Sequence, residues 1–200
     1  MPAVILTADA SLTPPSENRI PGNKGIWVGI FSEMTEFALL FSVYFLAKAH
    51  HPEAFREGPP QLSTLAGMFN TIMMISGSYF VAKAVMAIRR NQRDICARWL
   101  YGVAFTIAGY LITKYFEFQW NVEHGINGRT SIFFTTYYYL TFTHMVHIVW
   151  GAMGLLWVTV RTKTGAYSPE DHEGLEAFAS YWHATDLAWL IIFPLLYVLR

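Results

Sequence analysis

The sequence predicts an all-α membrane protein, a bundle of five transmembrane helices with its N-terminus in the cytoplasm and its C-terminus in the periplasm. Hydrophobic residues make up 54% of the chain and charged residues only 14%, about half the charge of an average globular protein. Five apolar stretches are each long enough to cross a bilayer core of about 30 Å as a helix. Charge, glycine and proline concentrate in the segments between them.

Composition also excludes several classes of protein. The formal net charge is zero, so nothing indicates a nucleic-acid partner. The single cysteine, Cys96, rules out an internal disulfide and a thiolate metal cluster. The chain contains 7 Trp, 11 Tyr and 15 Phe, which suits the aromatic belts of a multi-pass membrane protein. The first residues lack a basic start followed by a long apolar run, so we expect the first span, not a cleaved signal peptide, to direct insertion.

The chain divides into a short tail and one bundle. Residues 1–18 are polar and contain Pro14 and Pro15, which predicts a flexible tail. Residues 19–200 are expected to form a single transmembrane bundle. Its predicted spans are 24–47, 62–88, 99–118, 132–160 and 175–199.

The orientation follows from the lysines and arginines near the ends of the spans. With the N-terminus inside, the inner segments carry eight of these residues: Arg19, Lys24, Arg89, Arg90, Arg93, Arg98, Arg161 and Lys163. The outer segments carry four: Lys48, Arg56, Arg129 and Arg200. Because cytoplasmic loops are enriched in basic residues, this imbalance predicts an inner N-terminus and an outer C-terminus.

The first span carries two acids, Glu33 and Glu36, in its middle. A charged acid at the centre of a bilayer costs about 2.5–3.5 kcal/mol on the insertion scale, so each side chain should face protein. One interpretation is a neutral carboxyl group that is hydrogen-bonded between helices. The other is a proton-handling or coupling site.

The second and third spans carry polar groups that favour structural roles. Small and hydroxyl residues such as Ser76, Gly77 and Ser78 let helix backbones approach closely in lipid, so we interpret that face as a packing surface. Lys114 and Glu117 lie three residues apart near the outer end of the third span. This spacing suits an ion pair between buried side chains, which we interpret as structural.

The last two spans bring further ionisable residues to the inner half of the membrane. His144 and His147 lie three residues apart on the fourth span, as do His183 and Asp186 on the fifth, and each pair shares one helix face. From the helix rise, these four residues and Glu33 are expected at comparable depth. Hydrogen bonds between helices are the simplest interpretation of each histidine.

Metal and transport alternatives remain open at this point. A metal site could use His144, His147 and His183, although di-iron bundles use Glu-x-x-His pairs that this chain lacks. Haem ligation by His147 and His183 would need an antiparallel pair of helices at matched depth. A transporter should have helices that are broken near the membrane centre, and Pro194 is the only proline well inside a span.

Motifs in all five spans resemble the subunit III family of the haem–copper oxidases, the cytochrome c oxidase subunit 3 family. The match runs over nearly the whole length from Arg19, with five motifs in the same order as in the family. They are Gly-Ile-Trp-Val-Gly-Ile-Phe-Ser-Glu-Met at 25–34, Asn70-Thr71 with Ser76-Gly77, Glu117, Phe133-Phe134 with Thr143-His144-Met145-Val146-His147 and Gly151, and Tyr181-Trp182-His183 with Asp186 and Trp189.

This chain also departs from the family pattern. Full-length members usually have seven membrane helices, and the two without a counterpart in this chain are the first two. The chain therefore resembles the short members, particularly the subunit-III-like protein that accompanies bacterial nitric oxide reductase. Glu36 is an additional acid, and Met145 stands where the family usually has glycine.

The resemblance implies a non-catalytic accessory subunit of a bacterial respiratory oxidase or nitric oxide reductase, located in the inner membrane. Such a subunit belongs to an oxidoreductase but holds no redox cofactor of its own. Its partners would be the catalytic haem-bearing subunit and membrane lipid, with room for a bound phospholipid, although the family's lipid cleft needs the two additional helices. The alternative function is a stand-alone membrane metalloprotein.

The resemblance also assigns roles to residues. Glu33 falls on the position of the family's carbodiimide-reactive glutamate, which is implicated in sustaining proton uptake by the catalytic subunit. We expect Glu33 to be largely protonated at rest because a low dielectric disfavours a carboxylate. Six residues are expected to be its buried polar partners in the bundle: His144, His147, His183, Asp186, Glu117 and Lys114.

Overall fold

A computed structural model describes residues 20–199, so the predicted tail at 1–18 lies outside the described residues. Five long helices account for most of the described chain. They are α1 (Lys24–His50), α3 (Thr64–Arg89), α4 (Arg93–Glu123), α5 (Ile132–Lys163) and α6 (Glu173–Phe193). Three short elements complete the described fold: α2 (Pro52–Glu57), the 3₁₀ turn η1 (Pro59–Gln61) and the π-helical segment η2 (Pro194–Val198).

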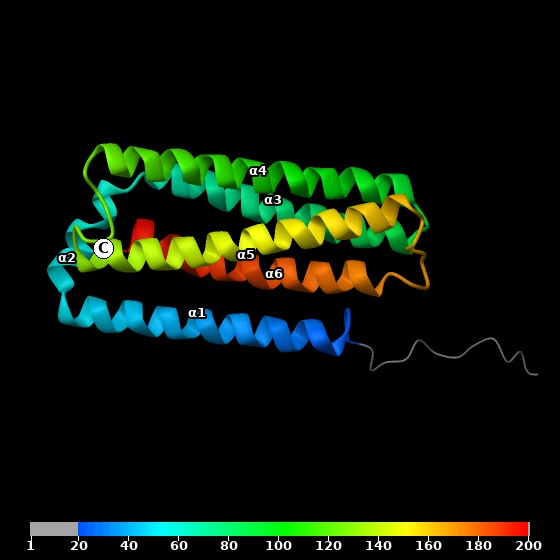
Figure 1. Cartoon of the computed structure of the whole chain (residues 1–200), viewed down its shortest axis with the longest axis horizontal. Helices are drawn as coiled ribbons and strands as arrows, with labels where there is room; N and C mark the ends of the chain where they lie inside the picture. The colour runs from blue at the N-terminus through cyan, green and yellow to red at the C-terminus, as the bar shows by residue number, and fades with distance from the viewer. Residues whose placement is uncertain (1–19, 200) are drawn as a thin grey trace, which may run out of the picture.

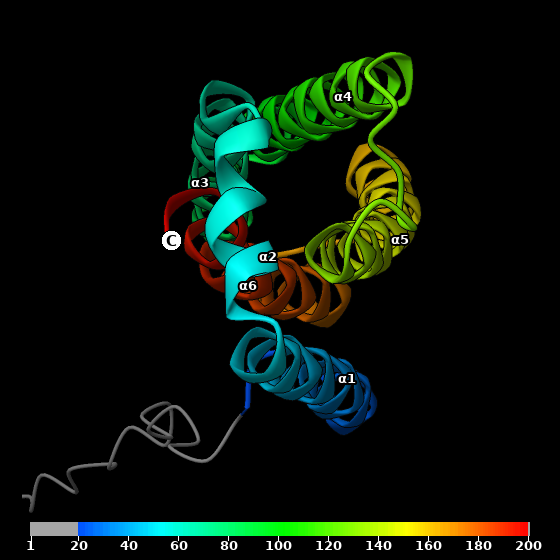
Figure 2. The same ribbon diagram turned by 90° about the vertical axis from the view of Figure 1, so that its left-hand side faces the viewer.

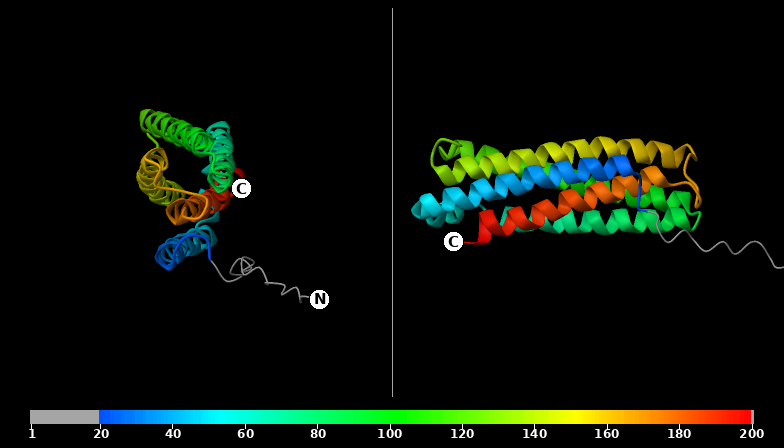
Figure 3. Two further views of the ribbon diagram at one scale, coloured as in Figure 1. Left: turned by 90° about the vertical axis from the view of Figure 1, so that its right-hand side faces the viewer. Right: turned by 90° about the horizontal axis from the view of Figure 1, so that it is seen from below.

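The long helices lie lengthwise beside one another, and successive helices run in opposite directions (Figure 1). Seen from the end, α3, α4, α5 and α6 surround a common core, and α1 lies outside this group against α6 and α5 (Figure 2). The view from below shows α1, α5 and α6 side by side along their length (Figure 3). The short helix α2 crosses one end of the bundle between α1 and α3 (Figure 2).

Within residues 20–199, four helices are long and apolar enough to cross a membrane: α1, α3, α4 and α5. They coincide with the first four predicted spans. The fifth predicted span coincides with α6 and η2, but α6, which carries Glu176, His183 and Asp186, is not among these four helices. A helix whose surface is mostly covered by protein needs fewer apolar residues than one that faces lipid. The fifth span and the orientation in the membrane stay predictions.

The sequence placed the helix centres well and several ends less well. Around the third predicted span, 99–118, helix α4 runs farther at both ends, from Arg93 to Glu123. The loop predicted after the first span instead forms α2 and η1. Pro52 at the first position of α2 and Pro59 at the first position of η1 suit the helix start, where the missing N–H would have no helical partner.

Polar side chains cap the starts of three of the long helices. Asn23 accepts a hydrogen bond from the Ile26 amide, Ser63 from the Ala66 amide, and Ser131 caps α5 in the same way. Each cap provides a partner for a backbone N–H that has no acceptor within its helix. In a membrane protein such caps provide hydrogen-bond partners for the backbone at the helix ends, which lie near the lipid headgroups.

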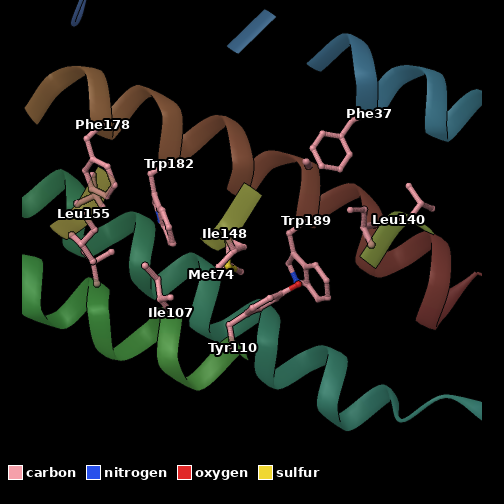
Figure 4. Close-up of a cluster of buried hydrophobic side chains, with 14 of the residues drawn as sticks. Phe37, Met74, Ile107, Tyr110, Leu140, Ile148, Leu155, Phe178, Trp182 and Trp189 are labelled. Atoms are coloured by element: carbon pink, nitrogen blue, oxygen red, sulfur yellow. The ribbon is translucent and has the colours of Figure 1, made fainter. Parts of the chain in front are cut away.

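The core lies among α3, α4, α5 and α6, and large aromatic side chains fill it (Figure 4). The Trp182 indole is fully buried between two glycines on neighbouring helices. A Cβ atom at Gly151 would lie 3.2 Å from the Trp182 ring, and one at Gly77 would lie 2.8 Å from the Thr106 hydroxyl. The predicted packing role of Gly77 is confirmed, because a larger residue there would push α3 away from its neighbours.

Helix α1 is attached along one narrow line. Ile30, Phe37 and Tyr44, spaced seven residues apart, are its buried residues. The Tyr44 hydroxyl donates a 2.5 Å hydrogen bond to the Leu195 carbonyl, which lies in η2. Most other apolar residues of α1 are exposed, so much of this helix faces away from the described bundle.

The segment before α1 is tied to α6 by a second contact. Gly22 has φ +69°, and a Cβ atom there would lie 2.7 Å from the Ala177 Cα, so both the conformation and the close approach require glycine. The Gly22 amide donates to the Glu176 carboxylate (3.4 Å). Arg89 forms a 2.8 Å ion pair with the same carboxylate, and the His172 Nε2 atom lies 3.1 Å from it. These contacts join α1, α3 and α6 at one end of the bundle.

Candidate functional site

The two acids of α1 meet one histidine of α5. The His147 Nε2 atom lies 3.9 Å from Glu33 Oε1 and 3.7 Å from Glu36 Oε2. We call Glu33, Glu36 and His147 the acid–histidine cluster. Glu33 and His147 are mostly covered, with side-chain exposures of 20% and 11%, whereas Glu36 is 54% exposed. The cluster therefore connects a covered acid with one on the outer surface of the helix pair.

The backbone fixes which nitrogen of His147 faces the acids. His147 Nδ1 lies 2.8 Å from the Thr143 carbonyl, which can only accept a hydrogen bond, so Nδ1 carries a proton and donates. Nε2 thus faces both carboxyl groups either as a lone pair or as the second N–H of an imidazolium. Three acceptors around one point repel one another unless they share at least one proton. The arrangement is suited to holding a proton.

The surroundings of Glu33 add an aromatic wall and a hydroxyl group. The Phe37 ring lies 5.1 Å from the His147 ring, and Phe37 points from α1 toward α6 (Figure 4). Tyr181 of α6 lies beside Glu33 and donates its hydroxyl hydrogen to the His147 carbonyl at 3.1 Å. The second carboxyl oxygen of Glu33, Oε2, is buried and has no hydrogen-bond partner within residues 20–199. That oxygen is available to form a hydrogen bond when the protonation of the cluster changes.

His144 lies deeper than His147 and is separate from the acids. Its side chain is fully buried, and both ring nitrogens have partners. Nε2 donates to the Thr185 carbonyl of α6 at 3.2 Å, so Nδ1 is the acceptor for the Tyr110 hydroxyl of α4 at 2.9 Å. Trp189 packs against both the His144 and Tyr110 rings at 5.2 Å (Figure 4 shows Tyr110 and Trp189). His144 therefore links three helices in its neutral form.

The third histidine predicted to face the bundle interior does not do so. His183 is exposed on the α3–α6 surface, where its Nδ1 atom lies 2.8 Å from the Ser78 hydroxyl. Asp186, one helical turn farther along, is buried and lies beside Ser78. The prediction for His183 was wrong because the inner face of α6 is occupied by Trp182, Thr185 and Trp189, which leaves His183 on the opposite side.

The geometry does not fit the metal and haem alternatives. His144 has no free nitrogen, the Nδ1 of His147 is bonded to backbone, and His183 faces a different surface. Within residues 20–199, no three His, Cys, Asp or Glu side chains are arranged to hold a metal ion. The set His144, His147 and His183 is therefore not a ligand set in this fold.

Lys114 and Glu117 form a separate polar group, to which no member of the acid–histidine cluster donates or accepts a hydrogen bond. The Lys114 ammonium is fully buried and donates to Glu117 Oε2 at 2.8 Å and to the Tyr197 hydroxyl at 2.6 Å. Tyr197 in turn donates to Glu117 Oε1 at 2.6 Å. Four rings lie within 5.7 Å of the ammonium: Phe118, Tyr137, Trp189 and Tyr197. The rings and the carboxylate together compensate the buried charge, which agrees with a structural ion pair.

Three tyrosines that were not predicted as site residues complete these groups. Tyr110, Tyr181 and Tyr197 supply hydroxyl groups to His144, the His147 backbone and Lys114, respectively. Each tyrosine lies within an apolar span, where a buried hydroxyl needs a partner. That need is a signal in the sequence, but it does not identify the partner, because the partner lies on another helix.

Comparisons with known proteins agree with these observations. The family model described as cytochrome c oxidase subunit III matches residues 19–199. The chain is 31% identical to the cytochrome c oxidase subunit 3 of Synechocystis over 176 residues, which cover 88% of this chain and 74% of that protein. It is 29% identical to the subunit 3 of Thermostichus vulcanus, with 88% and 86% covered. A protein named heme-copper oxidase subunit I+III from Aeropyrum pernix is 26% identical, with 86% of this chain and 22% of that protein covered.

Proposed function

Because this chain belongs to the cytochrome c oxidase subunit III family, a multi-pass membrane subunit of respiratory oxidases, we propose that it supports proton supply to a catalytic partner through Glu33. Subunits of this family are accessory and carry no redox cofactor. The chain would thus act by stabilising the catalytic subunit and by holding a proton near it, not by transferring electrons.

The contact between Glu33 and His147 is the observation that supports this proposal. A carboxyl group in the middle of a membrane helix is costly unless it is fully paired, so an incompletely paired one is a candidate for a functional role. Glu33 is neither fully buried nor fully paired, since its Oε2 atom has no partner within the described residues. By contrast, both carboxyl oxygens of Glu117 accept hydrogen bonds, one from Lys114 and one from Tyr197. The incomplete pairing makes Glu33 the better candidate for exchanging a proton.

The proposed partner is the haem-bearing subunit I of a terminal oxidase or of a nitric oxide reductase. The subunit I+III protein of Aeropyrum pernix carries both subunit types in one chain, which supports a direct contact between them. Resemblance to the short, reductase-associated members supports the nitric oxide alternative. A pull-down from mild detergent, followed by an optical spectrum of the co-purified haems, would distinguish the two partners. Recovery of this chain without any haem protein would argue against both.

Turnover of the assembled complex tests the role of Glu33. The complex with Glu33→Gln should assemble normally but lose activity faster during sustained turnover than the wild-type complex. Glu53→Gln is a matched control, because Glu53 pairs with Arg56 on the exposed face of α2. Equal turnover lifetimes of the wild-type and Glu33→Gln complexes would disprove the proposed role.

A further inference from the structure

One side of α1 faces away from the bundle along the whole helix. Only 11% of the most apolar stretch of α1 is buried, compared with 33% to 39% in α3, α4 and α5. Seen from the end, α1 lies outside the group of four helices and turns one side away from it (Figure 2). We call this side the outer face of α1. Its exposed residues, which recur at helical spacing, are Val28, Ser32, Thr35, Glu36, Leu39 and Val43.

Glu36 places a carboxyl group in the middle of the outer face. It lies near the centre of α1, and 54% of its side chain is exposed. The His147 Nε2 atom lies 3.7 Å from Glu36 Oε2, which is longer than a hydrogen bond. Acyl chains offer no hydrogen-bond donor, so an acid that faces them at this depth is costly. A protein surface that supplies a donor would remove this cost.

The two hydroxyl groups beside Glu36 already use their hydrogens within α1. Ser32 donates to the Val28 carbonyl at 3.0 Å, and Thr35 donates to the Phe31 carbonyl at 2.8 Å. Each hydroxyl oxygen keeps lone pairs that can accept a hydrogen bond, and an ionised Glu36 can only accept. The centre of the outer face therefore presents acceptors, and a surface that carries donors would be complementary to it.

The outer face also leaves room for a second helix to approach closely. A Cβ atom at Gly29 would have nothing within 4 Å. Gly25 lies one turn earlier and is exposed as well, so the two residues have the Gly-x-x-x-Gly spacing that lets membrane helices pack at short distance. A helix packed here would reach Ser32 and Glu36 in the following turns.

We propose that the outer face of α1 binds a transmembrane helix of another protein, and that this helix presents a hydrogen-bond donor of Lys, Arg, Asn or Gln to Glu36. A second copy of this chain fits less well. Two copies share one orientation in the membrane, so a symmetric pair of α1 helices would bring Glu36 against Glu36 and acceptors against acceptors. The proposal shares with the proposed function the need for a membrane partner, but it does not require Glu33 to carry a proton.

Crosslinking to model helices tests the chemistry of the outer face. The full chain, with a photoreactive amino acid replacing Leu39, is placed in vesicles with leucine-rich transmembrane helices that carry a central Asn, Lys, Glu or Leu. We expect the Asn and Lys helices to be crosslinked about tenfold more than the Glu and all-leucine helices, because only the first two bring a donor that stays available at neutral pH. Equal crosslinking of the Asn and all-leucine helices would overturn the proposal.

Variants show whether Glu36 is responsible. Glu36→Leu removes the acceptor and should reduce crosslinking of the Asn helix to the level of the all-leucine helix. Glu36→Gln keeps an oxygen that accepts and should retain most of the crosslinking. Glu53→Leu is the matched control, because Glu53 is exposed on α2, outside the outer face. Unchanged crosslinking in Glu36→Leu would contradict the proposed role of Glu36.

The same photoreactive chain identifies the natural partner helix in membranes that contain the assembled complex. We expect the crosslinked peptide to come from a membrane span of another protein, with Lys, Arg, Asn or Gln within one helical turn of the crosslinked residue. Crosslinks to lipid alone, or to a second copy of this chain, would refute the proposal. Glu33→Gln, which tests the proposed function, should leave the crosslinks in place, so the two proposals can fail separately.

Discussion

The Glu33 carboxyl group and the His147 imidazole face each other where α1 packs against α5, with Oε1 3.9 Å from Nε2. The contact joins a helix that is attached along a narrow line to one that is part of the core. Because His147 Nδ1 is committed to the Thr143 carbonyl, Nε2 is the only ring atom of His147 that can respond to Glu33. Protonation of either group therefore changes the interaction between α1 and the bundle.

Labelling by a hydrophobic carbodiimide tests whether the Glu33 carboxyl group lies within the membrane and is protonated. We expect slow labelling of the wild-type chain, because the reagent partitions into lipid and reacts with a protonated carboxyl group. Glu33→Gln should abolish the labelling, and Glu36→Gln should retain it. The measurement is peptide mapping by mass spectrometry, and unchanged labelling of Glu33→Gln would sink the hypothesis.

The hydrogen bonds of His144 predict a cost for losing the Tyr110 hydroxyl. Tyr110→Phe leaves the buried Nδ1 atom of His144 without a donor, which should lower the unfolding free energy by about 1–3 kcal/mol. Tyr115→Phe is the matched control, since Tyr115 lies on the same helix and is exposed. Thermal unfolding in detergent measures both variants. Similar small losses in the two would mean that the hydrogen bond contributes little.

The closed group around Lys114 predicts strong coupling between two substitutions. Lys114→Met or Glu117→Gln alone removes one member of a buried ion pair and should cost about 3–5 kcal/mol. The double variant leaves no uncompensated charge, so it should recover much of that loss. A double-mutant cycle from denaturant unfolding gives the coupling energy. Additive losses would show that the two charges do not depend on each other.

The close approach of Gly22 to α6 predicts that alanine substitutions at Gly22 and at Gly29 change the stability in opposite directions. Gly22→Ala combines a positive φ with a Cβ atom 2.7 Å from the Ala177 backbone, so it should cost about 1–3 kcal/mol and loosen α1. Gly29→Ala has nothing within 4 Å and should stabilise α1 by about 0.5–1 kcal/mol. Thermal unfolding compares them, and equal effects would contradict the proposed contact.

Metal analysis of the purified chain tests the stand-alone metalloprotein alternative. Since both nitrogens of His144 are already bonded, we expect no stoichiometric iron or copper and no change in metal content with His144→Ala. Stoichiometric metal that disappears in His144→Ala would favour the alternative and would require the side chains around His144 to rearrange.

The long helices could be predicted because their signal is local. Each of α1, α3, α4 and α5 is a long apolar run whose length alone indicates a span. The pairing of Lys114 with Glu117 followed in the same way, since two residues three apart share a helix face.

The candidate site could be predicted only in part, because it depends on how the helices are rotated. The predicted depth in the membrane is similar for Glu33 and His147. Depth along a helix, however, does not tell in which direction a side chain points. His183 lies at a similar depth and faces the opposite side of α6. Glu36 had no assigned partner from the sequence, and its contact with His147 arises from the packing of α1 on α5.

The attachment of α1 also has a consequence for how the chain folds during its synthesis on the ribosome. The hydrogen bonds that fasten α1 reach residues more than 150 positions later, from Tyr44 to Leu195 and from Gly22 to Glu176. From the end of α1 at His50 to the end of α6 at Phe193, 143 residues remain to be made, which takes roughly 7 to 30 s at a synthesis rate of roughly 5–20 residues per second. Until His147 has been made, Glu33 and Glu36 lack the histidine that they contact in the finished fold. Of the five long helices described, α1 is thus translated first, and it is among the last to complete its contacts.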